Sequence, residues 1–149
     1  MSEEHFTLRQ EFDVPATLVF EAVLNVDAWW AETIEGATHV LNDEFIYRYK
    51  DLHYSKHRLE ELLPNKRIVW RVIDSHLSFA ADTAEWTGTS MEFDVIETGQ
   101  NTILIFTHKG LTPDIHCFKN CSGAWSFYIL ESLGDLIRTG KGKPDKLIT

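Results

Sequence analysis

The pattern of apolar and polar positions predicts three short elements at the start of the chain. Residues 5–12 alternate between apolar and polar, which is typical of a strand. Pro15 then stands where the first turn of a helix is expected, and apolar residues follow it at steps of three and four. A break at 25–27 separates this helix from a shorter one that carries Trp29 and Trp30.

From Gly36 onward the hydrophobic period changes to two. Turn residues such as Pro64-Asn65 and Gly99-Gln100-Asn101 separate the alternating segments. Strands joined by such short connections pair as antiparallel neighbours. The predicted strands are 36–41, 44–50, 53–63, 66–73, 87–97 and 102–110.

The last part of the chain carries one long apolar stripe. Its members step by three and four residues, which predicts a helix over 114–139 that ends before Gly140. A sheet of about seven antiparallel strands buries one face only if another element covers it, so we expect this helix to lie across a curved sheet in an α+β fold. The stripe consists of Ile115, Phe118, Cys121, Trp125, Ile129, Leu133 and Leu136.

Composition restricts the function classes. The chain of 149 residues has no linker or repeat, so we expect one domain over 1–149. Its net charge is −9, and residues 1–47 hold ten acids against one base, which argues against a nucleic-acid partner. No apolar run is long enough for membrane insertion, and the first residues lack the pattern of a signal peptide. We therefore expect a cytoplasmic protein.

Several motifs resemble those of a known family. The chain is similar to bacterial homologues of the C-terminal domain of the activator of heat-shock-protein ATPase (AHSA-like), within the START and birch-pollen-allergen-like (SRPBCC) superfamily. The similarity spans nearly the whole chain, and its last two blocks are the most specific. It is carried by Ala28-Trp29-Trp30, the segment 62–70, Glu85-Trp86-Thr87-Gly88-Thr89, the segment 102–113, and Cys117, Cys121, Gly123, Trp125, Ser132-Leu133 and the segment 139–144.

The resemblance implies the helix-grip fold, in which a curved sheet wraps around a long C-terminal helix and leaves a hollow for an apolar small molecule. It also implies two alternatives, because some superfamily members are cyclases or dehydratases and the family's namesake acts on a chaperone. The first alternative is an enzyme that uses a cavity histidine. The second is an interaction module for a chaperone ATPase.

Few side chains offer catalytic chemistry. His116, Cys117 and Cys121 are too few for a zinc site, so we predict no metal and no cofactor, and we expect reduced cysteines. No nucleophile elbow or glycine-rich phosphate motif occurs. His57 and His108 remain as candidate proton shuttles, with a packed, non-catalytic histidine as the alternative for each. These residues therefore favour a binder over an enzyme.

Aromatic side chains from separate predicted elements project to one side and either fill the core or wall a cavity. The segment 74–84 between two strands is either a lid or a loop that docks on the body. The preferred function is the binding of an apolar or aromatic, lipid-like molecule between sheet and helix without covalent chemistry, and the oligomeric state stays open. The predicted ligand-binding residues are Trp30, Tyr49, His57, Trp70, Phe93, Phe118 and Trp125.

Overall fold

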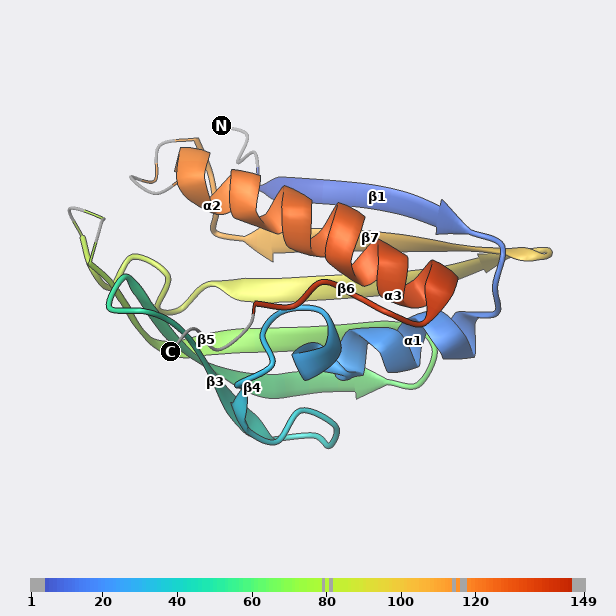
Figure 1. Ribbon diagram of the computed structural model, residues 1–149, viewed down its shortest axis with the longest axis horizontal. Helices are drawn as coiled ribbons and strands as arrows, with labels where there is room; N and C mark the ends of the chain where they lie inside the picture. The colour runs from blue at the N-terminus through green and yellow to red at the C-terminus, as the bar shows by residue number, and fades with distance from the viewer. Residues whose placement is uncertain (1–4, 79, 81, 114, 116–117, 146–149) are drawn as a thin grey trace.

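Seven antiparallel strands form one curved sheet, and a long C-terminal helix lies across one of its faces (Figure 1). This computed structural model describes residues 5–145 except 79, 81, 114, 116 and 117. The predicted α+β helix-grip fold is confirmed. The elements are β1 (Phe6–Phe12), α1 (Ala16–Leu24), the 3-10 turn η1 (Val26–Ala28), β2 (Glu35–Gly36), β3 (Glu44–Tyr49), β4 (His53–Leu63), β5 (Arg67–Leu77), β6 (Ser90–Thr98), β7 (Asn101–Lys109), α2 (Phe118–Trp125), the π-helical segment η2 (Ser126–Leu133) and α3 (Gly134–Thr139).

The strand order in the sheet is β1-β7-β6-β5-β4-β3-β2. Only β1 departs from the sequential order, because the first strand pairs with the last strand, β7, with Phe6 opposite His108. Register shifts between β4 and β5, at 56–57 and 59–61, are bulges that bend the paired strands. These bends help the sheet curve around the helix.

The strand predicted at 36–41 is wrong, because β2 is limited to Glu35–Gly36. Hydrogen bonds from side chains hold the following residues outside the sheet. The Thr38 hydroxyl donates to the Leu24 carbonyl oxygen at 2.8 Å, and the Asp43 carboxylate accepts the amides of His39 and Val40. Such side-chain bonds compete with the backbone ladder and favour a turn.

The C-terminal helix is continuous over 118–139 in the described chain, but its middle is π-helical. Its buried residues follow at steps of four, whereas an α-helix of 3.6 residues per turn would rotate such a stripe by about 40° at each step. The wider turns of η2 offset this rotation, so the stripe ends on Ile137 instead of the predicted Leu136, which is only half-buried. The buried apolar residues of this helix are Cys121, Trp125, Ile129, Leu133 and Ile137.

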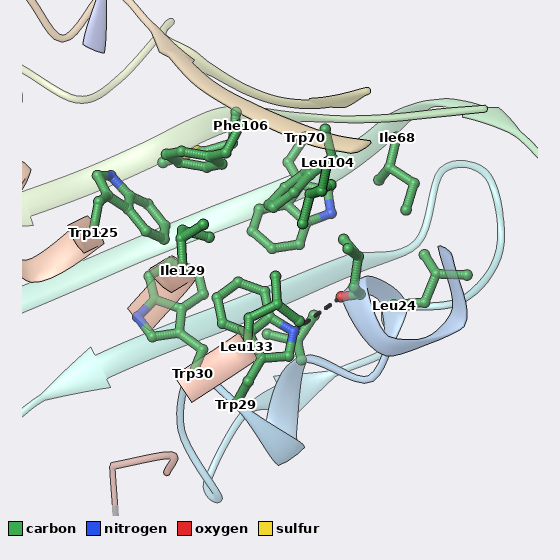
Figure 2. Close-up of a cluster of buried hydrophobic side chains, with 14 of the residues drawn as sticks. Leu24, Trp29, Trp30, Ile68, Trp70, Leu104, Phe106, Trp125, Ile129 and Leu133 are labelled. Carbon is green, nitrogen blue, oxygen red and sulfur yellow. Dashed lines mark hydrogen bonds between the residues drawn. The ribbon is translucent and has the colours of Figure 1, made fainter. Parts of the chain in front are cut away.

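A cluster of large rings fills the space between the sheet and the helices (Figure 2). The indoles of Trp29, Trp30 and Trp70 are stacked, with centroids 5.9–6.1 Å apart. Each is at most 1% exposed. The Trp29 indole nitrogen donates to the Val23 carbonyl oxygen at 3.2 Å, so this buried polar group is satisfied. Within the described residues, no helix is both long and apolar enough to cross a membrane.

Candidate functional site

A cavity of about 410 Å³ opens between β3, β4 and the first turns of the C-terminal helix. It lies beside the ring cluster of the core, not inside it. Its wall is mainly apolar, and its rim includes the exposed Tyr49 at the end of β3 and the exposed Leu52 in the turn before β4. The lining residues are Trp30, Tyr47, Tyr49, Leu52, His53, Trp86, Asn120, Cys121, Ala124, Trp125, Tyr128 and Asp145.

Five of the lining rings contact one another in a closed cycle, which we call the aromatic cage. Tyr47 contacts His53 with centroids 4.9 Å apart, and His53 contacts Trp86 at 4.7 Å. Trp86 stacks on Trp125 at 6.0 Å, Trp125 meets Tyr128 at 6.4 Å, and Tyr128 returns to Tyr47 at 6.5 Å. The cage combines strands, a loop and the C-terminal helix, so it forms only in the complete fold.

Trp30 contacts the cage from the core side. Its ring stacks on Tyr47 at 4.3 Å and lies 5.0 Å from Trp125 and 6.3 Å from Tyr128. Trp30 also stacks on the core indole of Trp70, so the cavity wall and the core are one continuous layer of rings. A wall supported in this way is rigid, because close-packed interiors resist deformation.

The C-terminal tail brings a carboxylate to the cavity. Asp145 Oδ2 accepts hydrogen bonds from the hydroxyls of Tyr47 and Tyr128, each at 2.6 Å. Burial is the largest cause that raises the pKa of both phenols. The pKa of Tyr47 is raised further by Tyr128 and then by Asp145, and that of Tyr128 by Asp145, so both stay protonated donors. The tail itself is held by backbone bonds, since the Asp145 amide donates to Trp30 O and the Glu32 amide donates to Asp145 O, both at 2.9 Å.

Three side chains on one face of β4 form a hydrogen-bonded line from the core to the cavity. Ser55 Oγ lies 2.8 Å from Nε2 of both His53 and His57. The other ring nitrogen of His57, Nδ1, is buried without a partner in the described structure. A buried orphaned N–H is rarer than an orphaned acceptor, so we assign the proton of His57 to Nε2, which donates to Ser55. The Ser55 hydroxyl then donates to His53 Nε2, and His53 carries its proton on Nδ1.

Burial lowers the pKa of His53 to about 3. Burial also lowers the pKa of His57 well below its ordinary value, and the nearby His53 lowers it further. Both imidazoles are therefore neutral at physiological pH. His53, the member that lines the cavity, offers a neutral polar ring edge to a ligand.

His108 is engaged through both ring nitrogens. Its Nδ1 accepts the indole N–H of Trp125 at 3.0 Å, and its Nε2 lies 2.9 Å from Thr89 Oγ1, which donates to Trp86 O at 2.6 Å. These partners fix the neutral tautomer with the proton on Nε2. Burial lowers the pKa of His108 to about 3. The ring also contacts Trp86 edge-on at 4.8 Å, so His108 supports two members of the cage from behind.

The structure brings three of the seven predicted ligand residues to the cavity, namely Trp30, Tyr49 and Trp125. The others lie elsewhere. Three of them, His57, Trp70 and Phe93, are fully buried in the core behind the cavity, and Phe118 packs edge-on against Phe6 at 6.3 Å.

The sequence-based list omits four cage residues and the tail carboxylate. Two signals were available: His53 is four residues before His57 on the same strand face, and Tyr128 follows Trp125 by one helical turn. Nothing in the local pattern marks Trp86 or Asp145 as cavity residues. Trp86 lies in the long loop between β5 and β6, and Asp145 lies in the C-terminal tail.

Cys121 differs from expectation. Cys121 is disulfide-bonded, so the expectation of a reduced thiol at this position is wrong. His116 and Cys117 lie outside the described residues. Across the described positions, no three His, Cys, Asp or Glu side chains come together to hold a metal ion.

Solved structures of other proteins share this architecture. Neither a family model nor a curated protein sequence matches the chain. The solution structure of the Aha1 dimer from Colwellia psychrerythraea matches with a TM-score of 0.74 and 22% identity, covering 93% of this chain and 99% of that one. The chain has the fold of bacterial Aha1. The fold implied by the sequence resemblance is thereby confirmed.

Two other solved structures match over nearly their whole length. Protein SSP2350 from Staphylococcus saprophyticus matches with a TM-score of 0.67 and 17% identity, over 97% of this chain and 100% of that one. Protein MLL2253 from Mesorhizobium loti matches with a TM-score of 0.71 and 13% identity, over 91% and 98%. Because all three identities are low, these matches carry the fold alone, and the function rests on the site.

Proposed function

We propose that the protein binds a small, largely aromatic or apolar molecule in the aromatic cage, without covalent chemistry. The observation that carries this proposal is the cavity of about 410 Å³ surrounded by a closed cycle of rings. Its volume falls within the range of about 300–1,000 Å³ that small-molecule sites occupy. Affinity would come mainly from buried apolar area.

The histidines favour binding over acid–base catalysis. Of the two sequence candidates, His108 uses both ring nitrogens for Trp125 and Thr89, and His57 is fully buried outside the cavity lining. The histidine that does line the cavity, His53, has its pKa lowered to about 3 by burial, far from the near-neutral value that suits a general acid or base. The cage is therefore better suited to holding a ligand than to moving a proton.

Native mass spectrometry of freshly purified protein tests the proposal. We expect an additional mass from a co-purified molecule, and we expect added tert-butylbenzene, a neutral aromatic probe, to change tryptophan emission because three of the five tryptophans line the cavity.

The Ala124→Phe variant provides the matched test. Ala124 is an exposed residue of the lining, so a phenyl group there fills the opening and abolishes both signals. Ala37→Phe, at an exposed position away from the cavity, keeps both. An unchanged signal in Ala124→Phe, or no bound mass and no response in the unaltered protein, would overturn the proposed function.

A further inference from the structure

One described residue gives the cavity a charge. Among the described lining residues only Asp145 carries a formal charge at neutral pH, because His53 remains neutral there. Asp145 forms no ion pair with a lysine or arginine of the described chain. Its two partners are neutral phenols. The cavity therefore contains a carboxylate whose charge is not neutralised by any described neighbour.

The rings around this carboxylate suit a cation. The face of an aromatic ring carries negative potential, and tryptophan attracts cations most strongly. The cavity presents the rings of Trp30, Trp86 and Trp125, together with the phenols of Tyr47 and Tyr128. Because both phenols donate to the Asp145 carboxylate, their oxygens become more electron-rich and the negative potential of their ring faces increases. Aromatic cages recognise quaternary ammonium groups, and a nearby carboxylate adds attraction for the positive charge.

One cation–π contact exists at the rim of the cavity. Lys50 Nζ lies 5.3 Å from the ring centroid of Tyr49, the exposed ring at the opening. The net charge of the whole chain, −9, acts in the same direction, because it attracts cations and repels anions over a distance of about 8 Å at physiological ionic strength. Local rings, the local carboxylate and the overall charge therefore favour the same class of ligand.

We propose that the ligand of the aromatic cage is an organic cation, a compound whose quaternary or protonated ammonium group contacts the rings of Trp86, Trp125 and Tyr128 beside Asp145. This inference rests on the proposed function and specifies the substrate class of the same site. The remainder of the ligand is apolar or aromatic and fills the rest of the cavity.

Asp145 also holds the C-terminal tail, so its charge and its hydrogen bonds must be separated in the test. Asp145→Asn keeps an oxygen that accepts from Tyr47 and Tyr128 and removes only the negative charge. Asp13→Asn is the matched control, because Asp13 is exposed, lies outside the cavity lining and changes the net charge by the same amount.

The probes are trimethylphenylammonium and tert-butylbenzene, which have the same shape and differ in charge. Binding is measured by tryptophan emission at physiological salt. We expect the unaltered protein to bind the cation roughly tenfold more tightly, a difference typical of a partly desolvated cation–π site. In Asp145→Asn we expect the affinity for the cation to fall about tenfold while the affinity for tert-butylbenzene stays within about twofold. Asp13→Asn should leave both affinities within about twofold, because distant surface charges are screened.

The outcomes separate the two proposals. If the unaltered protein binds tert-butylbenzene as tightly as the cation or more tightly, the cavity binds ligands but the cation inference is overturned. An equal loss of both probes in Asp145→Asn assigns Asp145 to holding the tail and also overturns it. If neither probe binds, the proposed function fails together with the inference.

Discussion

Buried histidines set the chemistry of this molecule at the scale of single residues. The sequence singled out His57 and His108 because each shares its strand face with apolar residues, and both are indeed inside the protein. A shared face could not show what their ring nitrogens contact. Those contacts come from Trp125, Thr89 and Ser55, and two of these residues belong to other elements. His108 is a structural support for the cage, not a reactive group.

Stability should therefore fall as the pH is lowered. The pKa of His108 is about 3 in the native protein against an ordinary value of 6.5, so between these values the unfolded chain binds a proton that the native protein does not. The stability that the neutral His108 contributes is fully present above about pH 6.5, and it decreases as the pH falls toward 3. At about pH 5 we expect proton binding to His108 in the unfolded chain to have lowered the free energy of unfolding by about 2 kcal/mol.

Urea unfolding of His108→Gln at about pH 7.5 and pH 5 measures this contribution. Glutamine can accept from Trp125 and donate to Thr89 but does not titrate, so the difference between the two pH values should shrink by about 2 kcal/mol. His76→Gln is the control, since His76 is exposed and should leave that difference within about 0.5 kcal/mol. The same pH dependence in His108→Gln as in the unaltered protein would contradict the assignment.

At the scale of elements, the spacing of apolar residues predicted those strands whose pattern is continuous along the chain. The alternating segments became β3, β4, β6 and β7 nearly within their expected bounds, because their polar and apolar faces persist over many residues. The strand predicted after Gly36 is wrong, because hydrogen bonds of the Thr38 and Asp43 side chains form there in place of the backbone bonds of a strand. The π-helical η2 was also missed, since the same spacing fits an α-helix and only packing on the sheet selects the wider turn.

The candidate site was predicted less completely for a related reason. Trp30, Tyr49 and Trp125 could be selected because each is a ring in a segment that the sequence predicts to be a strand or helix, although Trp30 lies in a turn after η1. Trp86 and Asp145 come from a loop and from the tail, where no period indicates direction. Their positions depend on long-range contacts, which a local pattern does not encode.

The tail that carries Asp145 passes close to the backbone of Ala28 and Ser132 at Gly142. A Cβ there would overlap the Ala28 carbonyl oxygen and lie 3.0 Å from Ser132 O. Gly142→Ala should therefore loosen the tail and speed the hydrogen exchange of the Glu32 and Asp145 amides by about tenfold or more, which corresponds to about 1.4 kcal/mol. Both amides donate within this tail contact, so two-dimensional NMR can follow them individually.

Gly123→Ala is the control for this prediction. Gly123 is exposed on α2, and a Cβ there meets nothing within 4 Å. The variant should stabilise the helix by about 0.5–1 kcal/mol and leave the two tail amides unchanged. Unchanged exchange of these amides in Gly142→Ala would show that the tail does not depend on this approach.

At the scale of the whole molecule, one ring network joins all parts of the fold. Trp29 and Trp30 follow α1, Trp70 belongs to β5, and Trp125 lies on the C-terminal helix. Trp30 touches Trp29, Trp70 and Trp125, and Trp125 touches Trp86 in the long loop. The pairing of β1 with β7 adds the N-terminal strand at one edge of the sheet. Sheet, helix and loop therefore share contacts that are lost together.

This network predicts a single cooperative unfolding transition. All five tryptophans are at most 3% exposed, so their emission reports on the network, while far-UV circular dichroism reports on the strands and helices. In urea the two signals should change with the same midpoint, as expected for a two-state domain of under about 150 residues. Trp86→Phe is the control, because it removes the one tryptophan that the loop contributes. If emission changed at lower urea than circular dichroism, and Trp86→Phe removed that early phase, the loop and its side of the cage would open separately from the sheet, and the network would not unify the molecule.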